Sequence, residues 1–180
     1  MTWEQVLRGH LRVTEIVRDG ALFQVELGTW PSSEERAHAL TERQARVVGL
    51  VARGATNAEV GDALDLSEAS AGALAARGLS RLGLARREQM VVVRAALGDA
   101  PADAPSLPAA RVAAQAELLS RLSPCQREVA LLAVEGHPNV QIASLRGTSP
   151  GTIANQLVSV FRRLGLSGRA TLAARLLGVA

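Results

Sequence analysis

The polar side chains with the clearest chemical potential in this sequence lie close together, in one short stretch of its last third. Asn155 and Gln156 carry amides that can pair with adenine through two hydrogen bonds, and Arg163 can pair with guanine or with phosphate. Ser149 and Thr152, at a predicted helix start, can hold a phosphate together with free backbone amides. These groups match the edges and the backbone of a DNA duplex. A polar helix face by itself is more typical of ordinary solvated surface than of a DNA contact, so the surrounding elements must decide.

A helix is predicted to carry these residues, because apolar side chains recur there with the helical period and form one stripe to bury. The stripe consists of Ile153, Leu157, Val160 and Leu164. The opposite face is expected to carry Asn155, Gln156, Ser159 and Arg163. Positive charge for phosphate contacts is expected from Arg146, Arg162 and Arg169.

One stretch of the sequence recurs further along the chain, without a gap and at a constant spacing, so that Gly54 is matched by Gly136. We call this constant spacing the repeat offset. The same offset carries Arg81-Leu82-Gly83-Leu84 onto Arg163-Leu164-Gly165-Leu166. An unbroken register over about fifty residues indicates a duplicated small domain. We therefore divide the chain into an N-terminal segment (1–39), a first unit (40–97), a Pro/Ala linker (98–109) and a second unit (110–180).

Each unit is predicted to hold four short helices. The first opens on a capping box, Thr41 with Gln44 or Ser123 with Gln126, and ends at a glycine. The other helices are expected at 57–64, 68–82 and 86–97, and at 139–146, 150–164 and 168–177, with a leading helix at 110–121. The second unit has Arg146 at the position where the first unit has the core-type Leu64. We expect Leu145 to take over the packing role of that leucine in the second unit.

The N-terminal segment has a different pattern. Residues 2–8 are predicted to form a short helix, and alternating apolar residues on both sides of Asp19-Gly20 predict a β-hairpin. Pro31-Ser32-Ser33 can cap a helix that runs toward residue 39. Because two isolated strands are marginal in water, the hairpin must pack on the first unit or on a second chain. The predicted fold class is mainly α, with two tandem four-helix helix-turn-helix domains and a short hairpin.

Composition excludes several classes of function. All twenty basic residues are Arg, and counting charges gives −2 for 1–39, +2 for 40–97, −1 for 98–121 and +4 for 122–180. This excess in the units suits a polyanion, although solvated surface explains it equally well. His10, His38 and His137 are scattered, and no metal-ligand spacing, phosphate loop or nucleophile turn is present, so neither an enzyme nor a cofactor nor a metal is expected.

Cellular location is indicated by the cysteine count and by hydropathy. Cys125 is alone, which excludes an intrachain disulfide and suits the reducing cytoplasm; we expect it to be a passive residue at a helix start. No apolar run reaches the roughly 20 residues that span a bilayer, and no leader is evident. The expectation is a cytoplasmic protein without a membrane partner.

Four short helices, a Ser-initiated third helix and the ending Arg-Leu-Gly-Leu followed by Arg form a specific pattern. It resembles the LuxR-type (GerE-like) helix-turn-helix domain of bacterial transcription regulators, most clearly over residues 122–172 and more weakly over 40–90. The resemblance implies that the third helix enters the major groove, that the helix before it contacts the DNA backbone, and that the fourth helix pairs two domains. The fourth region of sigma factors is a related alternative, but the Leu-Gly-Leu-x-x-Arg ending favours the LuxR type.

The units depart from this pattern to different degrees. A Lys that the family usually carries in the third helix is replaced by Ala154 and by Gly72. The first unit also has Ala73 and Leu74 in place of Asn155 and Gln156, so we expect it not to read bases. Its Ala71 and Gly78 replace the core residues Ile153 and Val160, and a helical Gly costs about 1 kcal/mol relative to Ala. Only non-specific phosphate contacts are expected from Arg77 and Arg81.

The resulting hypothesis is a DNA-binding transcription regulator in which the second unit reads DNA and the first packs or dimerises. We expect a homodimer that places two third helices in successive major grooves, about 34 Å apart, with the hairpin as one candidate contact. The apolar fourth helices are expected to pair, within one chain or between chains, or to form a broad core contact. The expected dimer or partner interface is Leu74, Val92, Val93, Leu172 and Leu176. The alternative is a protein-interaction module, a regulator or antagonist of another factor that kept the fold without DNA readout.

Overall fold

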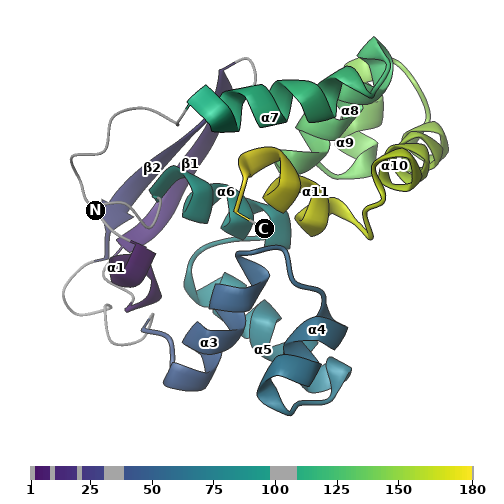
Figure 1. Cartoon of the computed structure of the whole chain (residues 1–180). Coiled ribbons are helices and arrows are strands. Elements are labelled where there is room, and N and C mark those ends of the chain that lie inside the picture. Colours follow the sequence, from purple (N-terminus) through teal and green to yellow (C-terminus); the bar gives the residue numbers. More distant parts are fainter. Residues whose placement is uncertain (1–2, 9–10, 20–21, 31–38, 98–108, 180) are drawn as a thin grey trace.

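The computed structural model describes residues 3–8, 11–19, 22–30, 39–97 and 109–179, and this part of the chain is mainly helical with one antiparallel β-hairpin (Figure 1). The N-terminal segment contains α1 (Trp3–Leu7), β1 (Leu11–Asp19) and β2 (Leu22–Thr29). The first unit contains α3 (Glu42–Val51), α4 (Asn57–Leu64), α5 (Glu68–Arg81) and α6 (Arg87–Leu97). The second contains α7 (Ala109–Ser120), α8 (Pro124–Val134), α9 (Asn139–Arg146), α10 (Pro150–Leu164) and α11 (Arg169–Leu177). The helix predicted from Pro31 and the linker up to residue 108 lie outside the described residues.

The two units place their helices at equivalent positions. The first residues of α8, α9, α10 and α11 follow those of α3, α4, α5 and α6, respectively, by the repeat offset. Both predicted capping boxes are confirmed: the Thr41 and Ser123 hydroxyls accept from the amides of Gln44 and Gln126, whose side chains accept in return from the cap residues. Ser67 and Ser149 cap α5 and α10 as predicted. Local capping therefore sets the same helix starts in both units.

One cap was not predicted. Thr56 and Glu59 form a capping box at the start of α4, where the Thr56 amide donates to Glu59 Oε2 over 2.7 Å. Hydrogen bonds from the backbone and side chain of Thr56 lower the pKa of Glu59. The equivalent cap of α9 is Pro138, which provides no side-chain hydrogen bond. The two units thus start this helix by different means.

The buried apolar side chains of the described residues form three groups. One joins α3, α4, α5 and α6 with Trp3 and Val6 of α1. A second lies where α6 meets α11, α7 and α8, and a third fills the space between α8, α9 and α10. The second group contains residues of both units, so the units share a core.

The two fourth helices, α6 and α11, pack on each other at the centre of the molecule (Figure 1). Val91 and Val92 of α6 are buried in the same group as Leu172, Ala173 and Leu176 of α11. The structure thus shows the two fourth helices in contact within one chain, which is one of the arrangements that the sequence left open. The faces predicted for a dimer contact are consequently covered by the chain itself.

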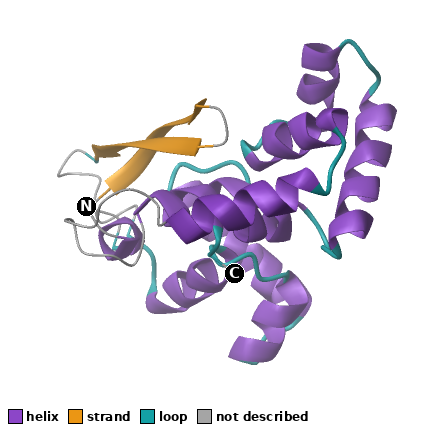
Figure 2. Cartoon of the chain, turned by 45° about the horizontal axis from the view of Figure 1, so that its top comes forward, coloured by secondary structure: helices purple, strands orange, loops and turns teal. Residues whose placement is uncertain are grey.

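The hairpin packs on the same central region, as Figure 2 shows beside the helices. Val13 and Leu27 lie against the core of the first unit, while Ile16 and Val25 contact both that core and the shared one. The strands pair from Leu11 with Thr29 to Asp19 with Leu22, with a register shift between Val13 and Glu15. The hairpin therefore packs against the cores of its own chain.

One packing prediction was wrong. Leu145 does not replace Leu64 in the core, because its side chain is 62% exposed. Arg146 beside it is exposed as well. The second unit closes its core in this region without either residue.

Candidate nucleic-acid interface

The exposed ridge of α10 is the first component of the candidate interface. Ile153, Leu157 and Val160 are buried as predicted, and Leu164 is half-buried. Residues Gly151, Asn155, Val158 and Arg162 are exposed and follow one another at helical spacing. Val158, 61% exposed, was missed as a candidate, although it lies on the same face as Asn155, one helical turn further on. The ridge therefore presents an amide, an aliphatic group and a guanidinium to solvent.

Three predicted residues do not share this ridge. Gln156, Ser159 and Arg163 lie on the flank of α10 that faces the start of α8, because each residue advances about 100° around a helix. Gln126 Nε2 donates to Ser159 Oγ over 3.2 Å, and Gln156 Nε2 lies 3.5 Å from Cys125 Sγ. The prediction that all four polar residues stand opposite the apolar stripe is therefore correct only for Asn155.

Gln156 and Arg163 differ in how firmly they are held. Arg163 Nη1 donates to the carbonyl of Arg121 over 3.2 Å, and Arg121 Nη2 donates to the carbonyl of Arg163 over the same distance. Gln156 Oε1 is buried and has no hydrogen-bond partner among the described residues. Arg163 is thus tied to the turn between α7 and α8, whereas little holds the Gln156 amide in place.

The start of α10 forms the second component. Ser149 Oγ accepts from the Thr152 amide over 3.1 Å and lies 2.9 Å from Thr152 Oγ1. Both side chains are exposed, as is Pro150 between them. Arg146, at the end of α9, is exposed and places its Nη2 3.3 Å from Cys125 Sγ. A helix start with hydroxyls and a nearby guanidinium has the chemistry to hold a phosphate.

Charge separates this surface from its counterpart in the first unit. Across α9, α10 and their connecting turn, the charged residues are Arg146, Arg162 and Arg163, with no carboxylate among them. The equivalent stretch of α4 and α5 has only Arg77 and Arg81 as cations. It also carries four exposed carboxylates, those of Glu59, Asp62, Asp65 and Glu68. The α9–α10 stretch is net positive and the α4–α5 stretch is net negative, so only the α9–α10 stretch suits a polyanion.

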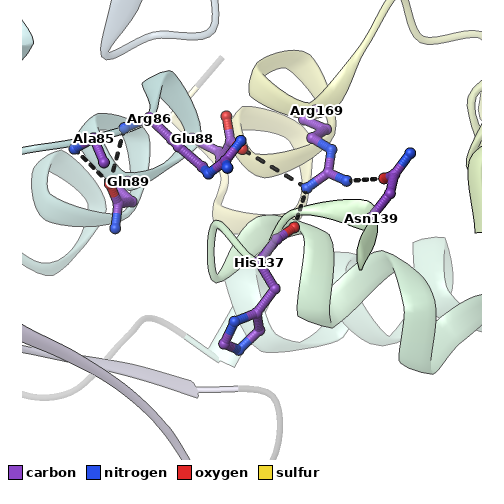
Figure 3. A network of polar contacts seen from close by, with 7 residues as sticks. All are labelled: Ala85, Arg86, Glu88, Gln89, His137, Asn139 and Arg169. Atoms are coloured by element: carbon purple, nitrogen blue, oxygen red, sulfur yellow. Dashed lines mark hydrogen bonds and ion pairs between the residues drawn. The ribbon is translucent and has the colours of Figure 1, made fainter. Parts of the chain in front are cut away.

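Arg169 was predicted to contact the DNA backbone, but it lies in a network inside the chain (Figure 3). Its guanidinium donates to the carbonyl of His137 over 2.6 Å and to Asn139 Oδ1 over 2.5 Å. Glu88 Oε1 of α6 lies 3.8 Å from Arg169 Nη1. Burial lowers the pKa of Arg169, and the Glu88 carboxylate partly offsets that effect. Arg169 ties the start of α11 to the start of α9 and to the first unit.

The same ties recur in the first unit. Arg87, which the repeat offset carries onto Arg169, donates to Asn57 Oδ1 and, over 2.8 Å, to the carbonyl of Ala55. Arg81 Nη1 likewise donates to the carbonyl of Ala39 and to Gln44, as Arg163 does to Arg121 and Gln126. Burial lowers the pKa of Arg87 too. These four arginines position helices in both units, a role that the sequence repeat alone could have indicated.

The predicted dimer or partner residues are largely covered. Val92, Val93 and Leu172 are fully buried, and Leu176 is 2% exposed. Leu74 is half-buried against the core of the first unit. Among the residues whose side chains the structure describes, the large apolar ones that remain exposed lie instead on the second unit, at Val140, Leu145 and Val158.

The residues that the structure describes form no group of three or more His, Cys, Asp or Glu side chains arranged to hold a metal ion. Cys125 is exposed in the first turn of α8. None of the described helices combines the length and the apolar character needed to cross a membrane.

Comparison with known proteins gives one family match. Residues 38–94 match the model of the bacterial regulatory proteins of the luxR family. No curated protein and no solved structure matches the chain. The match spans α3, α4, α5 and most of α6, so it falls on the unit in which the resemblance was expected to be weaker, and not on the second unit. Residues 38–94 are therefore similar to luxR-family regulatory proteins, which supports a helix-turn-helix regulator that binds DNA.

Proposed function

We propose that this chain is a cytoplasmic transcription regulator in which α10 reads DNA in the major groove and α9 lies against the DNA backbone. The observation that carries the proposal is the charge contrast between equivalent surfaces. The α9–α10 stretch has three arginines and no carboxylate, whereas α4–α5 has four exposed carboxylates. Only the former surface can approach a phosphate backbone without repulsion.

The residues of the α10 ridge have complementary roles in this proposal. Asn155 pairs with an adenine edge, Val158 contacts a thymine methyl, and Arg162 binds a phosphate. Gln156 lies beside the ridge, and because its amide oxygen has no partner among the described residues, turning it toward a base sacrifices little. Arg146 adds a phosphate contact near the start of α10, where Ser149 and Thr152 hold a second phosphate.

The first unit acts as a packing partner. Its α5 presents Ala73 and the half-buried Leu74 where α10 presents Asn155 and Gln156, and neither can pair with a base edge. Its α6 contributes Val91 and Val92 to the core shared with α11. On this reading the two units are tandem copies with divided roles.

The experiment is a binding titration on duplexes that the protein itself selects from a random-sequence library, at several salt concentrations. Asn155→Ala should cost about 1–3 kcal/mol at one base pair and relax selectivity there. Arg162→Ala should weaken binding to all sequences and reduce the salt slope by about 1. Arg77→Ala, a matched exposed arginine on α5, should change neither quantity.

The protein-interaction alternative makes the opposite forecast. In that case the chain selects no sequence, and its weak binding is the same for wild type and for Asn155→Ala. Of the surfaces on which this alternative depended, the apolar faces of the fourth helices are buried in the cores, and Leu74 is half-buried against the core of the first unit. It is therefore the less supported reading.

A further inference from the structure

The contacts between the two units are reciprocal. A Cβ atom placed on Gly54 would lie 3.4 Å from the Thr171 Cα on α11, and one placed on Gly136 would lie 3.1 Å from the Gln89 Cγ on α6. Gly136 is the repeat equivalent of Gly54, and Thr171 is the repeat equivalent of Gln89. Each unit thus presses the turn after its first helix against the fourth helix of the other. Such exchange of equivalent contacts is the signature of a two-fold, self-complementary interface.

The buried side chains follow the same rule. Val91 and Val92 on α6 have Ala173 and Ala174 as their equivalents on α11, and all four lie in one core group. The valines of one helix therefore face a helix with alanines at the matching positions, so large groups meet small ones across the pair. Gly54 fits the same scheme, because its missing side chain leaves room for Ala174, whose Cβ would be 2.6 Å from an added Cβ. This difference in size lets α6 and α11 pair with each other, whereas two α6 helices would bring four valines together.

Figure 1 shows the consequence for the outer helices: α4 and α5 lie on one side of the α6–α11 pair, and α9 and α10 on the other. The chain has the arrangement of a two-fold dimer in which one outer helix pair, α9–α10, is net positive and the other, α4–α5, is net negative. The α4–α5 pair, with Glu59, Asp62, Asp65 and Glu68 exposed, repels the phosphates of a second groove.

We infer that each chain is its own dimerisation partner: α6 occupies the face of α11 that a second copy would otherwise take, and a single chain therefore binds a single, non-palindromic half-site. The intramolecular pairing stands on the contacts above, and the half-site rests on the proposed function. This single-chain arrangement stands in place of the homodimer that we expected from the sequence, in which two equivalent reading helices would bind DNA.

The test measures the mass of the protein in solution and the symmetry of the DNA sequence that it selects. The full chain is measured by size-exclusion chromatography with light scattering over a hundredfold concentration range, alone and on duplexes selected from a random-sequence library. We expect the mass of one chain, 18.9 kDa, throughout, and one chain per duplex. The selected sequences should share one short element without inverted symmetry, and a duplex with a second inverted copy about one helical turn away should bind each chain with unchanged affinity.

A grafted variant sharpens the test. Glu59→Gln, Asp62→Ser, Ala73→Asn and Leu74→Gln together give the first unit the residues found at the equivalent positions of the second. This variant should stay monomeric and gain at least tenfold affinity for the duplex with two inverted elements over the duplex with one.

The outcomes separate the two proposals. A mass that doubles with concentration, or a palindromic selected site with two chains bound cooperatively, overturns the intramolecular pairing. A chain that is monomeric at every concentration but selects no sequence confirms the pairing and contradicts the proposed function.

Discussion

The two units share a scaffold but not a surface. Helices α5 and α10 begin at equivalent positions of the repeat, are capped by Ser67 and Ser149, and are tied at their ends by Arg81 and Arg163 through equivalent hydrogen bonds. Their outward faces nevertheless differ in both charge and hydrogen-bonding groups. Caps and hydrogen-bonded arginines therefore preserve the position of a recognition helix, while its exposed ridge is free to lose or keep the chemistry for reading DNA.

The cores have also diverged, by exchange of large and small residues. A Cβ atom on Gly78 would lie 2.4 Å from Val48 Cγ2, so the Val48 side chain occupies the space above the α5 backbone. The equivalent pair in the second unit is Ala130 and Val160, both buried in one core group. Gly78 is therefore not merely a weak helix residue; it accommodates the valine of α3.

The largest expected effect comes from the core that joins the units. Leu172→Ala should lower the free energy of unfolding by about 2–5 kcal/mol, because the leucine is fully buried between α11 and α6. Leu145→Ala, a leucine of the same unit that is 62% exposed, is the matched control and should change stability by less than about 0.5 kcal/mol. Urea unfolding measures both, and equal losses would show that α6 and α11 do not form the central contact.

The arginine ties should give the next largest effect. Arg169→Ala should cost about 1.5–3 kcal/mol of unfolding free energy, since it removes charge-assisted bonds to His137 and Asn139 and leaves Glu88 without its ion pair. Arg87→Ala should cost less, because it removes the two equivalent hydrogen bonds but leaves the ion pair between Glu88 and Arg169 in place. Lysine at residue 169 should recover only part of the loss, since an ammonium cannot bridge both oxygens.

If denaturation shows no loss for Arg169→Ala while DNA affinity falls, the arginine contacts phosphate as the sequence first led us to expect. The comparison of the two units would then need a different explanation for the repeated network.

The smallest effect tests the exchanged core pair. Gly78→Val should destabilise the protein by about 1–3 kcal/mol, because the added side chain overlaps Val48. Adding Val48→Ala should restore most of that stability, since the double variant copies Ala130 and Val160. A double-mutant cycle measured by thermal unfolding checks this, and simple additivity of the two losses would mean that the pairs are not equivalent.

Much of the fold could be predicted because its signals are local. Capping residues, terminal glycines and apolar periodicity placed the helices of both units close to their observed bounds, and the Asp19-Gly20 turn indicated the hairpin. The pairing of α6 with α11 could not be decided, because apolar fourth helices suit partners in the same chain and in another equally well.

The candidate site was only partly predictable for a similar reason. The sequence pointed to α10, but the ridge of Asn155, Val158 and Arg162 depends on where α8 lies, which no local pattern gives. Arg169 was assigned to DNA because exposed and buried arginines look alike in a sequence. The matched position of Arg87 was the one clue that both arginines hold helices in place.

The most direct test of the division between a reading and a non-reading unit is an NMR titration of the protein with a selected duplex. The side-chain amides of Asn155 and Gln156, together with backbone amides of α9 and α10, should shift on binding. Those of α4 and α5, including Leu74, should stay within the change caused by a small rise in salt. Shifts centred on α5 instead of α10 would contradict the account.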